Sequence, residues 1–252
     1  MIHHINAGKI LRLFDFSNVD SIVKLGDEVE KVCNKNGEGV YKEYQIKGKS
    51  GMTDIEASCN KFRGDVEEVF VYYLMETNKL VFNISEVRYL DEEVEDDIGV
   101  DLVGKDASGK NVVTVQVKYV GDVTKNITWN EKRFGNFLSQ SLAREDEGGF
   151  GVTSKVRTYF FARRGILDSK VKKNFTSVGG KYYNEDRLSN LLPGLRGPVF
   201  WKELQTFMET WVAPVRLSSL ALRSHQVEIK KGIESFFTGS EERSFVVAPT
   251  VS

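Results

Sequence analysis

The sequence predicts an α/β protein with a central mixed β-sheet flanked by helices, followed by a helical extension towards its C-terminal end. A long segment with helical periodicity, residues 54–77, precedes the predicted sheet. Short runs rich in Val, Ile, Tyr and Phe, separated by turn residues, follow between residues 79 and 163. Helical patterns return after residue 168, so helices stand on both sides of a run of strands.

Residues 1–53 form an N-terminal extension to which the sequence assigns no role. A short helix is expected around Val19–Cys33, with Asn18 as its cap. The Gly- and Lys-rich segment Lys35–Gly51 is typical of a turn or a short hairpin.

Residues 54–77 are predicted to form one long helix. Its apolar side chains recur with a period of 3.6 residues and would bury one face. They are Phe62, Val66, Val69, Phe70 and Tyr73.

Strands are predicted next, and a second set of helices follows them. The turn Asp106–Gly109 between two of the strands indicates a β-hairpin. The predicted strands are Lys79–Ile84, Glu86–Leu90, Ile98–Val103, Val112–Val120, Val156–Arg163 and Ser244–Pro249. The predicted helices are Glu131–Arg144, Asp168–Phe175, Glu185–Leu192, Phe200–Val212 and Ser218–Phe237.

Composition excludes several classes of protein. Lys and Arg number 35 and Asp and Glu number 36, so a polycation that coats nucleic acid by bulk charge is not expected. Three His and two Cys leave little for a Cys-rich zinc finger or a Ser-His-Asp triad. No run of 18 apolar residues and no signal peptide is visible, and the two Cys suit a reducing compartment. We therefore expect a cytoplasmic protein with no membrane partner.

Three polar residues meet if two of the predicted strands form a hairpin. Gln116 and Lys118 lie two residues apart on one strand, so their side chains point the same way about 7 Å apart. Asp101 stands opposite the apolar face of the preceding strand and can reach the same place. A hairpin with one solvated polar face gives the same alternation, so the spacing leaves both interpretations open.

Such a group of side chains has a chemical use. A carboxylate and an amide oxygen are hard ligands suited to Mg²⁺. A bound cation polarises a phosphoryl group and lowers the pKa of a bound water. Lys118 can orient that water and balance negative charge in the transition state. This combination favours metal-assisted phosphodiester hydrolysis.

At these residues the sequence resembles the PD-(D/E)XK nuclease superfamily. The segments Gly99-Val-Asp101 and Gln116-Val-Lys118, with Gln in place of the usual acidic residue, resemble its Mrr-like restriction endonuclease branch. Residues 158–163 resemble the family's next strand, and residues 180–192 its closing strand and helix. The resemblance covers about residues 54–192 and implies a restriction-endonuclease-like core.

The resemblance also implies a set of site residues. Gly64-Asp-Val-Glu-Glu68 resembles the family's helical acidic element, and its spacing favours Glu68, with Glu67 as the alternative. Asp101, Glu68 and Gln116 would then bind Mg²⁺, for which Mn²⁺ substitutes, and Lys118 would position the water. Because Gln116 carries no charge, the helix carboxylate becomes more important to metal binding. The residue before Asp101 is Val100 where Pro is common in this branch.

A second resemblance lies at the end of the chain. Residues 222–226, Leu-Arg-Ser-His-Gln, and residues 245–250, Phe-Val-Val-Ala-Pro-Thr, look like the entry to a superfamily 2 helicase domain. We expect residues 193–217 to be a linker or helical connection and residues 218–252 to be the truncated start of a helicase-like ATPase domain. No Gly-Lys phosphate loop follows before Ser252, so no ATP binding is expected in this chain.

Basic residues gather in one part of the sequence. Between Lys155 and Arg187 there are nine Lys and Arg against three acidic residues. With Lys125, Lys132 and Arg133 they would form a wall that contacts DNA phosphates, or a surface that only aids solubility. The candidate contacts are Lys132, Arg133, Arg163, Arg164, Lys172 and Lys173.

The sequence thus predicts a Mg²⁺-dependent DNA endonuclease module that continues into a helicase or translocase. A homodimer would suit cleavage of both strands. The alternative is a non-catalytic DNA-binding or docking module of a helicase. RNA or branched DNA also stays open as the substrate.

Overall fold

The structure, a computed structural model, describes residues 2–89, 99–121, 126–127, 137–138, 141, 157–162, 166–177 and 179–212. Met1–Val212 form one compact unit. The predictions for Ser218–Phe237, for Ser244–Pro249 and for a helicase start at 218–252 lie outside the described residues. So does most of the predicted helix Glu131–Arg144.

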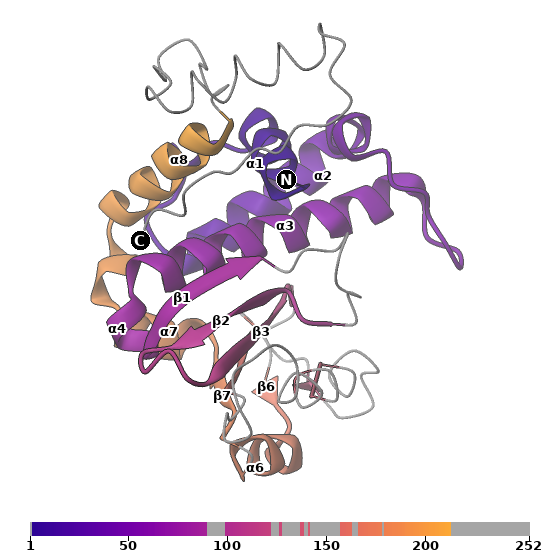
Figure 1. Cartoon of the computed structure of the whole chain (residues 1–252). Helices are drawn as coiled ribbons and strands as arrows, with labels where there is room; N and C mark the ends of the chain where they lie inside the picture. The colour runs from indigo at the N-terminus through magenta and orange to yellow at the C-terminus, as the bar shows by residue number, and fades with distance from the viewer. Residues whose placement is uncertain are drawn as a thin grey trace, which may run out of the picture. The chain divides into compact units, whose positions relative to one another are not determined.

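Helices come first along the chain, strands follow, and helices then return with the last described strand among them (Figure 1). The helices are α1 (Ile2–Leu13), α2 (Ile22–Tyr44), α3 (Asp54–Thr77), α4 (Lys79–Phe82), α6 (Ser169–Ser177), α7 (Glu185–Leu191) and α8 (Pro198–Val212), with 3₁₀ turns η1 (Phe16–Asn18) and η2 (Pro193–Arg196). The strands are β1 (Ile84–Tyr89), β2 (Leu102–Asp106), β3 (Val112–Lys118), β4 (Asn126–Ile127), β5 (Arg157–Ala162), β6 (Ile166–Leu167) and β7 (Lys181–Tyr183).

Five strands form a mixed sheet in the order β1-β2-β3-β5-β7. The pairs β1–β2 and β2–β3 are antiparallel, whereas β3–β5 and β5–β7 are parallel. Strands β4 and β6 form a separate parallel pair. The predicted class, α/β with a central mixed sheet flanked by helices, is therefore confirmed.

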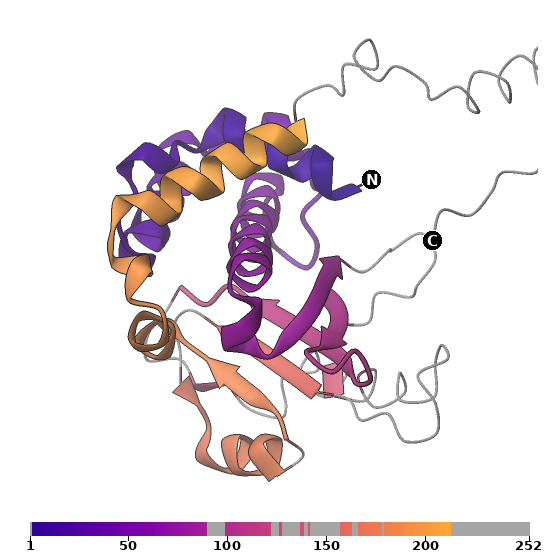
Figure 2. The ribbon, with the colours of Figure 1, turned by 60° about the vertical axis from the view of Figure 1, so that its left-hand side comes forward.

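Helices cover both faces of the sheet. Helices α1, α2, α3 and α8 gather on one side, and α6 lies on the other (Figures 1 and 2). The larger hydrophobic core lies under α3, where Val113 and Val115 of β3 point. A smaller core beneath α6 contains Val171 and Phe175. Strand β3, in the middle of the sheet, is thus buried from both sides along most of its length.

Helix α3 matches its prediction at both ends. It begins after Thr53, whose hydroxyl accepts a hydrogen bond from the Glu56 amide while the Glu56 carboxylate accepts one from Thr53. This capping box satisfies backbone groups that would otherwise lack a partner. The five apolar side chains predicted to share a face are all buried.

Helix α2 is longer than predicted and corrects the turn expected within Lys35–Gly51. The helix starts after Ser21 rather than Asn18 and continues to Tyr44, with a kink at Asn36. Val40 and Tyr44 are buried, and this burial outweighs the poor helix propensity of the local glycines. A Cβ on Gly37 would lie 2.9 Å from Cγ2 of Ile55, so glycine permits the close approach of α2 to α3.

The strand predicted at Lys79–Ile84 is wrong for all but its last residue. Residues 79–82 form the short helix α4, and Asn83 ends it in the left-handed conformation with a φ of 55°. Leu80 is 93% exposed while Phe82 is fully buried. A short apolar run of this kind does not by itself distinguish helix from strand.

The strand predicted at Ile98–Val103 is displaced: β2 begins at Leu102, four residues later, and ends at Asp106, three residues later. Strand β3 begins where predicted and ends two residues earlier. The hairpin turn between them is confirmed. The Asp106 carboxylate accepts hydrogen bonds from the backbone and side chains of Ser108 and Asn111, which fixes the turn.

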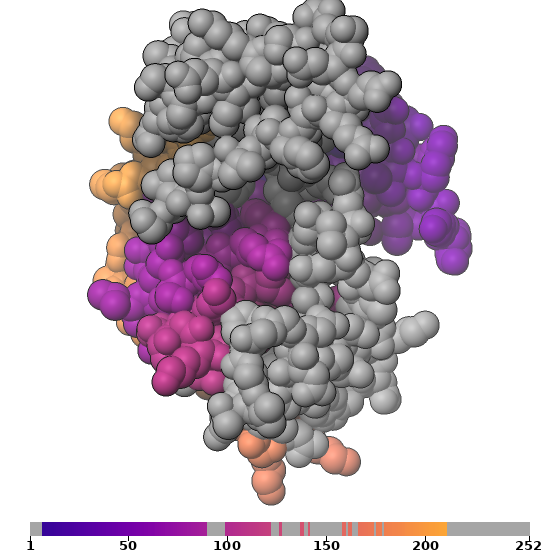
Figure 3. Space-filling view, viewed as in Figure 1, coloured from indigo at the N-terminus to yellow at the C-terminus, as the bar shows by residue number. Residues whose placement is uncertain are grey.

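The segment between α2 and α3 projects from the body of the molecule (Figures 1 and 3). The Asp54 carboxylate stabilises this segment where it joins α3. It accepts a hydrogen bond from the Gly48 amide and pairs with Lys47 at 3.0 Å. In the part of the chain that the structure describes, no helix is long and apolar enough to cross a membrane.

Candidate functional site

Asp101 lies beside the central strand of the sheet. Its backbone N–H donates to the Val115 carbonyl at 2.9 Å, and its Oδ2 accepts a hydrogen bond from the Val117 amide at 2.5 Å. Gly99, two residues earlier, has a φ of 97°, which favours glycine and lets the chain turn into this position. The carboxylate is therefore held against β3 at the residue between Gln116 and Lys118.

The register of the strands shows where the other two predicted residues lie. The ladder between β2 and β3 begins with Leu102 opposite Val115, and Asp101 lies just before it, held by the Val115 carbonyl and the Val117 amide. On the far side of β3, Gln116 pairs with Phe160 and Lys118 with Ala162 of β5. The structure thus places the Asp101 carboxylate beside the part of β3 that carries Gln116 and Lys118, and their meeting at one metal site stays a prediction.

Gln116 is buried in a way that suits a ligand. It is only 5% exposed, and its side-chain oxygen, Oε1, has no hydrogen-bond partner among the described residues. A buried amide oxygen without a partner costs about 1–3 kcal/mol, so such groups are uncommon unless something binds them. Lys118 is half-buried at the end of the same strand.

Glu68 approaches from helix α3 and is linked to this group through Tyr89. Burial raises the pKa of the Tyr89 hydroxyl well above its ordinary value, and the negative charges of Glu68 and Asp101 are among those that raise it further. Both carboxylates therefore lie close enough to act on the same phenol. Tyr89 is the last residue of β1, and its ring stacks on Tyr72 of α3 at 4.8 Å.

Two acidic residues of α3, Asp65 and Glu68, act on the same pair of tyrosines. Burial raises the pKa of Tyr44 and of Tyr89, and the charges of Asp65 and Glu68 raise both further. Residues three positions apart on a helix share a face, so Asp65 lies on the same side of α3 as Glu68. Glu67, the alternative, is 3% exposed, and the choice between Glu68 and Glu67 stays a prediction.

Asp65 is a buried carboxylate one turn before Glu68 that the sequence did not single out. It is 1% exposed and pairs with Lys61 at 2.8 Å. Burial raises the pKa of Asp65 above its usual range, although the charge of Lys61 acts against that shift. The helical period could have marked it, because Asp65 lies among Phe62, Val66 and Val69 in the apolar sequence of α3.

The donor set was compared with the needs of a divalent cation. Asp101, Glu68 and Gln116 supply two carboxylates and one amide, all hard oxygen ligands of the type that Mg²⁺ prefers. No group of three or more His, Cys, Asp or Glu suited to a metal occurs among the residues that the structure describes. The proposed set has only two such side chains, and its third donor, the buried Gln116 oxygen with no partner among the described residues, is of a type that binds a cation.

The basic residues are described only in part. Lys172 and Lys173 are exposed on α6, the helix on the face of the sheet opposite α3. Lys132, Arg133, Arg163 and Arg164 lie outside the described residues, as does the acidic run Asp91–Asp97. Tyr182, 8% exposed, packs in the smaller core.

Comparison of the chain with protein-family models, with curated proteins and with solved structures finds no match. The case for a function therefore rests on the residues themselves.

Proposed function

We propose that this protein is a metal-dependent nuclease that hydrolyses phosphodiester bonds of DNA, with a restriction-endonuclease-like core. The observation that carries the proposal is the position of the Asp101 carboxylate, hydrogen-bonded to the Val117 amide between Gln116 and Lys118. Two contacts to β3 hold this position, so the Asp101 carboxylate is ordered before any ligand binds.

In this proposal Asp101, Gln116 and Glu68 hold the cation. Asp101 brings a charge fixed against the sheet, and Gln116 brings a buried oxygen that has no hydrogen-bond partner in the described part of the chain. Glu68 of α3 is the proposed second carboxylate, whereas Gln116 and Lys118 alternate with the side chains of β3 that pack towards α3. A bound Mg²⁺, or Mn²⁺ in its place, would polarise the phosphate and lower the pKa of a bound water.

Lys118 acts on the reacting groups. Its ammonium orients the water and offsets the negative charge that builds on the phosphate oxygens in the transition state. The water oxygen bonds to phosphorus, the bond from phosphorus to one sugar oxygen breaks, and a proton passes to that sugar oxygen. Gln116 contributes no charge, so neutralisation of the cation depends on Asp101 and Glu68.

The order of helices and strands along the chain is consistent with the proposed nuclease core. The resemblance called for a helix with an acidic residue, a hairpin with the two motif segments, a further strand, and a closing strand and helix. The corresponding elements are α3, β2–β3, β5, and β7 with α7. Exposed Lys172 and Lys173 on α6 supply positive charge for DNA phosphates. We also propose that the chain is part of a nuclease–helicase protein.

Cleavage of supercoiled plasmid DNA tests the proposal. We expect the protein to nick or linearise the plasmid with Mg²⁺ or Mn²⁺ and to be inactive with a chelator. Asp101→Asn and Lys118→Ala should each lower the rate by about 10²–10³-fold, because each removes a group that stabilises the transition state.

Two matched variants control for surface charge. Lys105→Ala removes a lysine of the adjacent strand that pairs with Glu86 at 3.3 Å, and Glu43→Gln removes a carboxylate of α2 that pairs with Arg12. Both should cleave like the wild type. Cleavage that persists in Asp101→Asn and Lys118→Ala would sink the assignment. DNA binding without cleavage of plasmid, branched DNA or RNA would instead favour the docking role.

A further inference from the structure

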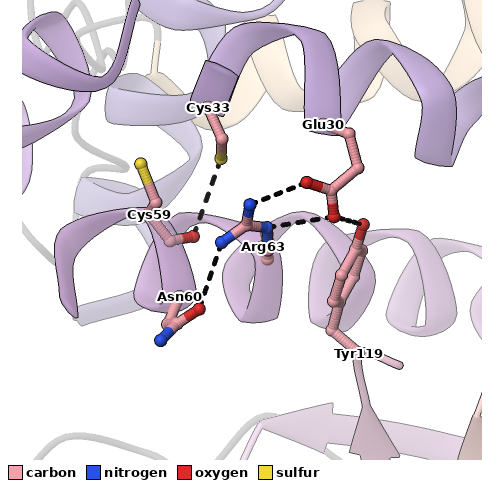
Figure 4. A network of polar contacts seen from close by, with 6 residues as sticks. All are labelled: Glu30, Cys33, Cys59, Asn60, Arg63 and Tyr119. Carbon is pink, nitrogen blue, oxygen red and sulfur yellow. Dashed lines mark hydrogen bonds and ion pairs between the residues drawn. The ribbon is translucent and has the colours of Figure 1, made fainter. Parts of the chain in front are cut away.

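A polar network joins the N-terminal helix α2 to the end of strand β3 (Figure 4). The Arg63 guanidinium of α3 donates two hydrogen bonds to Glu30 of α2, from Nε at 3.1 Å and from a terminal nitrogen at 2.7 Å. The Tyr119 hydroxyl donates to the same carboxylate. Arg63 also lies over the Tyr119 ring, 5.9 Å from its centroid. The Glu30 carboxylate thus links helices α2 and α3 to the end of strand β3.

The network is sheltered and charged. The side chains of Arg63 and Glu30 are 19% and 31% exposed. Burial, the largest single influence, lowers the pKa of Arg63, but the hydrogen bond to Glu30 and the neighbouring charges, that of Glu30 among them, together keep the pKa above its ordinary value. An arginine that donates two hydrogen bonds to one carboxylate fixes the orientation of that carboxylate better than a single hydrogen bond would.

Tyr119 directly follows Lys118, at the point where β3 ends. Successive side chains of an extended strand point to opposite faces, so the Tyr119 ring lies towards α3 while Lys118 points the other way. Fixing the ring therefore fixes the backbone that carries Lys118. It also restrains Val117, which lies two residues before Tyr119. The Val117 amide donates a hydrogen bond to the Asp101 carboxylate.

We propose that Glu30 and Arg63 are positioning residues for Lys118 and Asp101, acting through Tyr119. This inference rests on the proposed nuclease function and assigns a role to the N-terminal helices, for which the sequence suggested none. None of the three residues needs to touch DNA or metal. Their effect is to hold the end of β3 in one place while Lys118 works on the phosphate.

Two mild substitutions test the proposal in the full chain. Tyr119→Phe removes only the hydroxyl, and Glu30→Gln keeps the shape of the side chain. Each should lower kcat for plasmid cleavage by about 10- to 100-fold with KM changed less than about twofold, as expected when an outer residue orients a catalytic one. The double variant should fall little further than the worse single variant, because the two changes break the same link.

Matched controls separate positioning from stability. Glu43→Gln breaks a comparable Arg–Glu contact of the same helix, to Arg12. Tyr159→Phe removes a buried hydroxyl that donates to the Phe82 carbonyl at 2.6 Å. Tyr159→Phe should lower the melting temperature while leaving kcat unchanged. If Tyr119→Phe and Glu30→Gln keep wild-type kcat, the positioning role is overturned.

Hydrogen exchange at the Val117 amide gives a readout that does not need activity. Releasing the strand end should speed exchange at this amide by about tenfold in Tyr119→Phe and in Glu30→Gln, but not in Glu43→Gln. If the wild type cleaves no nucleic acid, the nuclease proposal fails by itself. The exchange result then decides the positioning proposal. An unchanged exchange rate of the Val117 amide in these two variants would overturn the positioning proposal. Faster exchange would support the view that the network restrains the end of β3.

Discussion

Ionisation of the Asp65 carboxyl group destabilises the folded protein. Its carboxyl group is buried on α3 with Lys61 as an ion-pair partner, and burial raises its pKa. The folded protein therefore binds a proton on Asp65 more tightly than the unfolded chain does. Stability falls as the pH rises from the unfolded pKa, about 3.9, through the folded pKa, and the loss persists at higher pH.

Asp65→Asn should stabilise the protein at neutral pH. We expect the melting temperature at pH 7 to rise by about 2–4 °C, the shift that ~1 kcal/mol produces in a protein of this size. The gain should disappear below about pH 4, where the wild-type carboxyl is neutral in both states. Thermal melts across this pH range measure the effect.

Asp54→Asn is the matched control on the same helix. The hydrogen bond from the Gly48 amide, followed by that from Lys47, lowers the pKa of Asp54, so its charge favours folding above the unfolded pKa. Its substitution should not raise the melting temperature at pH 7. An equal rise in both variants would contradict the burial argument.

Single residues of the site were predictable where their chemistry shows in the sequence. Asp101, Gln116 and Lys118 alternate with apolar residues, and the hairpin between them has a strong turn signal, so the position of Asp101 beside β3 was predictable from strand geometry. Tyr89 was not predicted as a neighbour of the site. The raised pKa of Tyr89 depends on its burial and on the charges around it, and no spacing in the sequence shows either.

At the level of elements, helix α8 belongs to the core that surrounds α3. Trp201 is fully buried and stacks on Phe70 of α3 with ring centroids 5.4 Å apart. Leu204 and Met208, on the same face of α8, are also fully buried. The composition change near residue 193 indicated a linker or helical connection, and its described part is a helix packed against the core.

Trp201→Ala should therefore cost about 3–5 kcal/mol of unfolding free energy, the usual loss for removing a buried aromatic side chain. Urea denaturation measures it. Val199→Ala, on the same helix but 66% exposed, should change stability by less than about 0.5 kcal/mol. A small loss in Trp201→Ala would mean that α8 does not pack as described.

Local signals predicted some elements well and others badly, for physical reasons. Helix α3 has both a regular apolar period and a capping box, so its ends were predicted to the residue. The second half of α2 has glycines and an Asn, and only contact with α3 makes it helical. Helix α4 is too short for periodicity to identify.

For the whole molecule, the N-terminal and C-terminal helices complete one core with the sheet. Side chains from α1, α2 and α8 join the same buried cluster as those from α3 and β3. The fragment 54–192, which the sequence outlined as the nuclease-like domain, lacks all three helices. It would expose apolar surface on α3 that is buried in the full unit.

A fragment of residues 1–212 should accordingly unfold in one cooperative transition, with a melting temperature close to that of the full chain. A fragment of residues 54–192 should show no cooperative transition or should aggregate. Circular dichroism and calorimetry on both fragments measure this. A cooperative transition in 54–192 at the full-chain temperature would refute the single-core description.

The central claim is that Asp101 and Gln116 hold a divalent cation beside Lys118. Anomalous diffraction from crystals grown with Mn²⁺ tests it most directly. We predict a manganese peak within about 2–2.5 Å of the Asp101 carboxylate and of Gln116 Oε1, absent from Asp101→Asn crystals grown in the same way. Manganese bound only elsewhere, or a peak at this place that survives in Asp101→Asn, would contradict the claim.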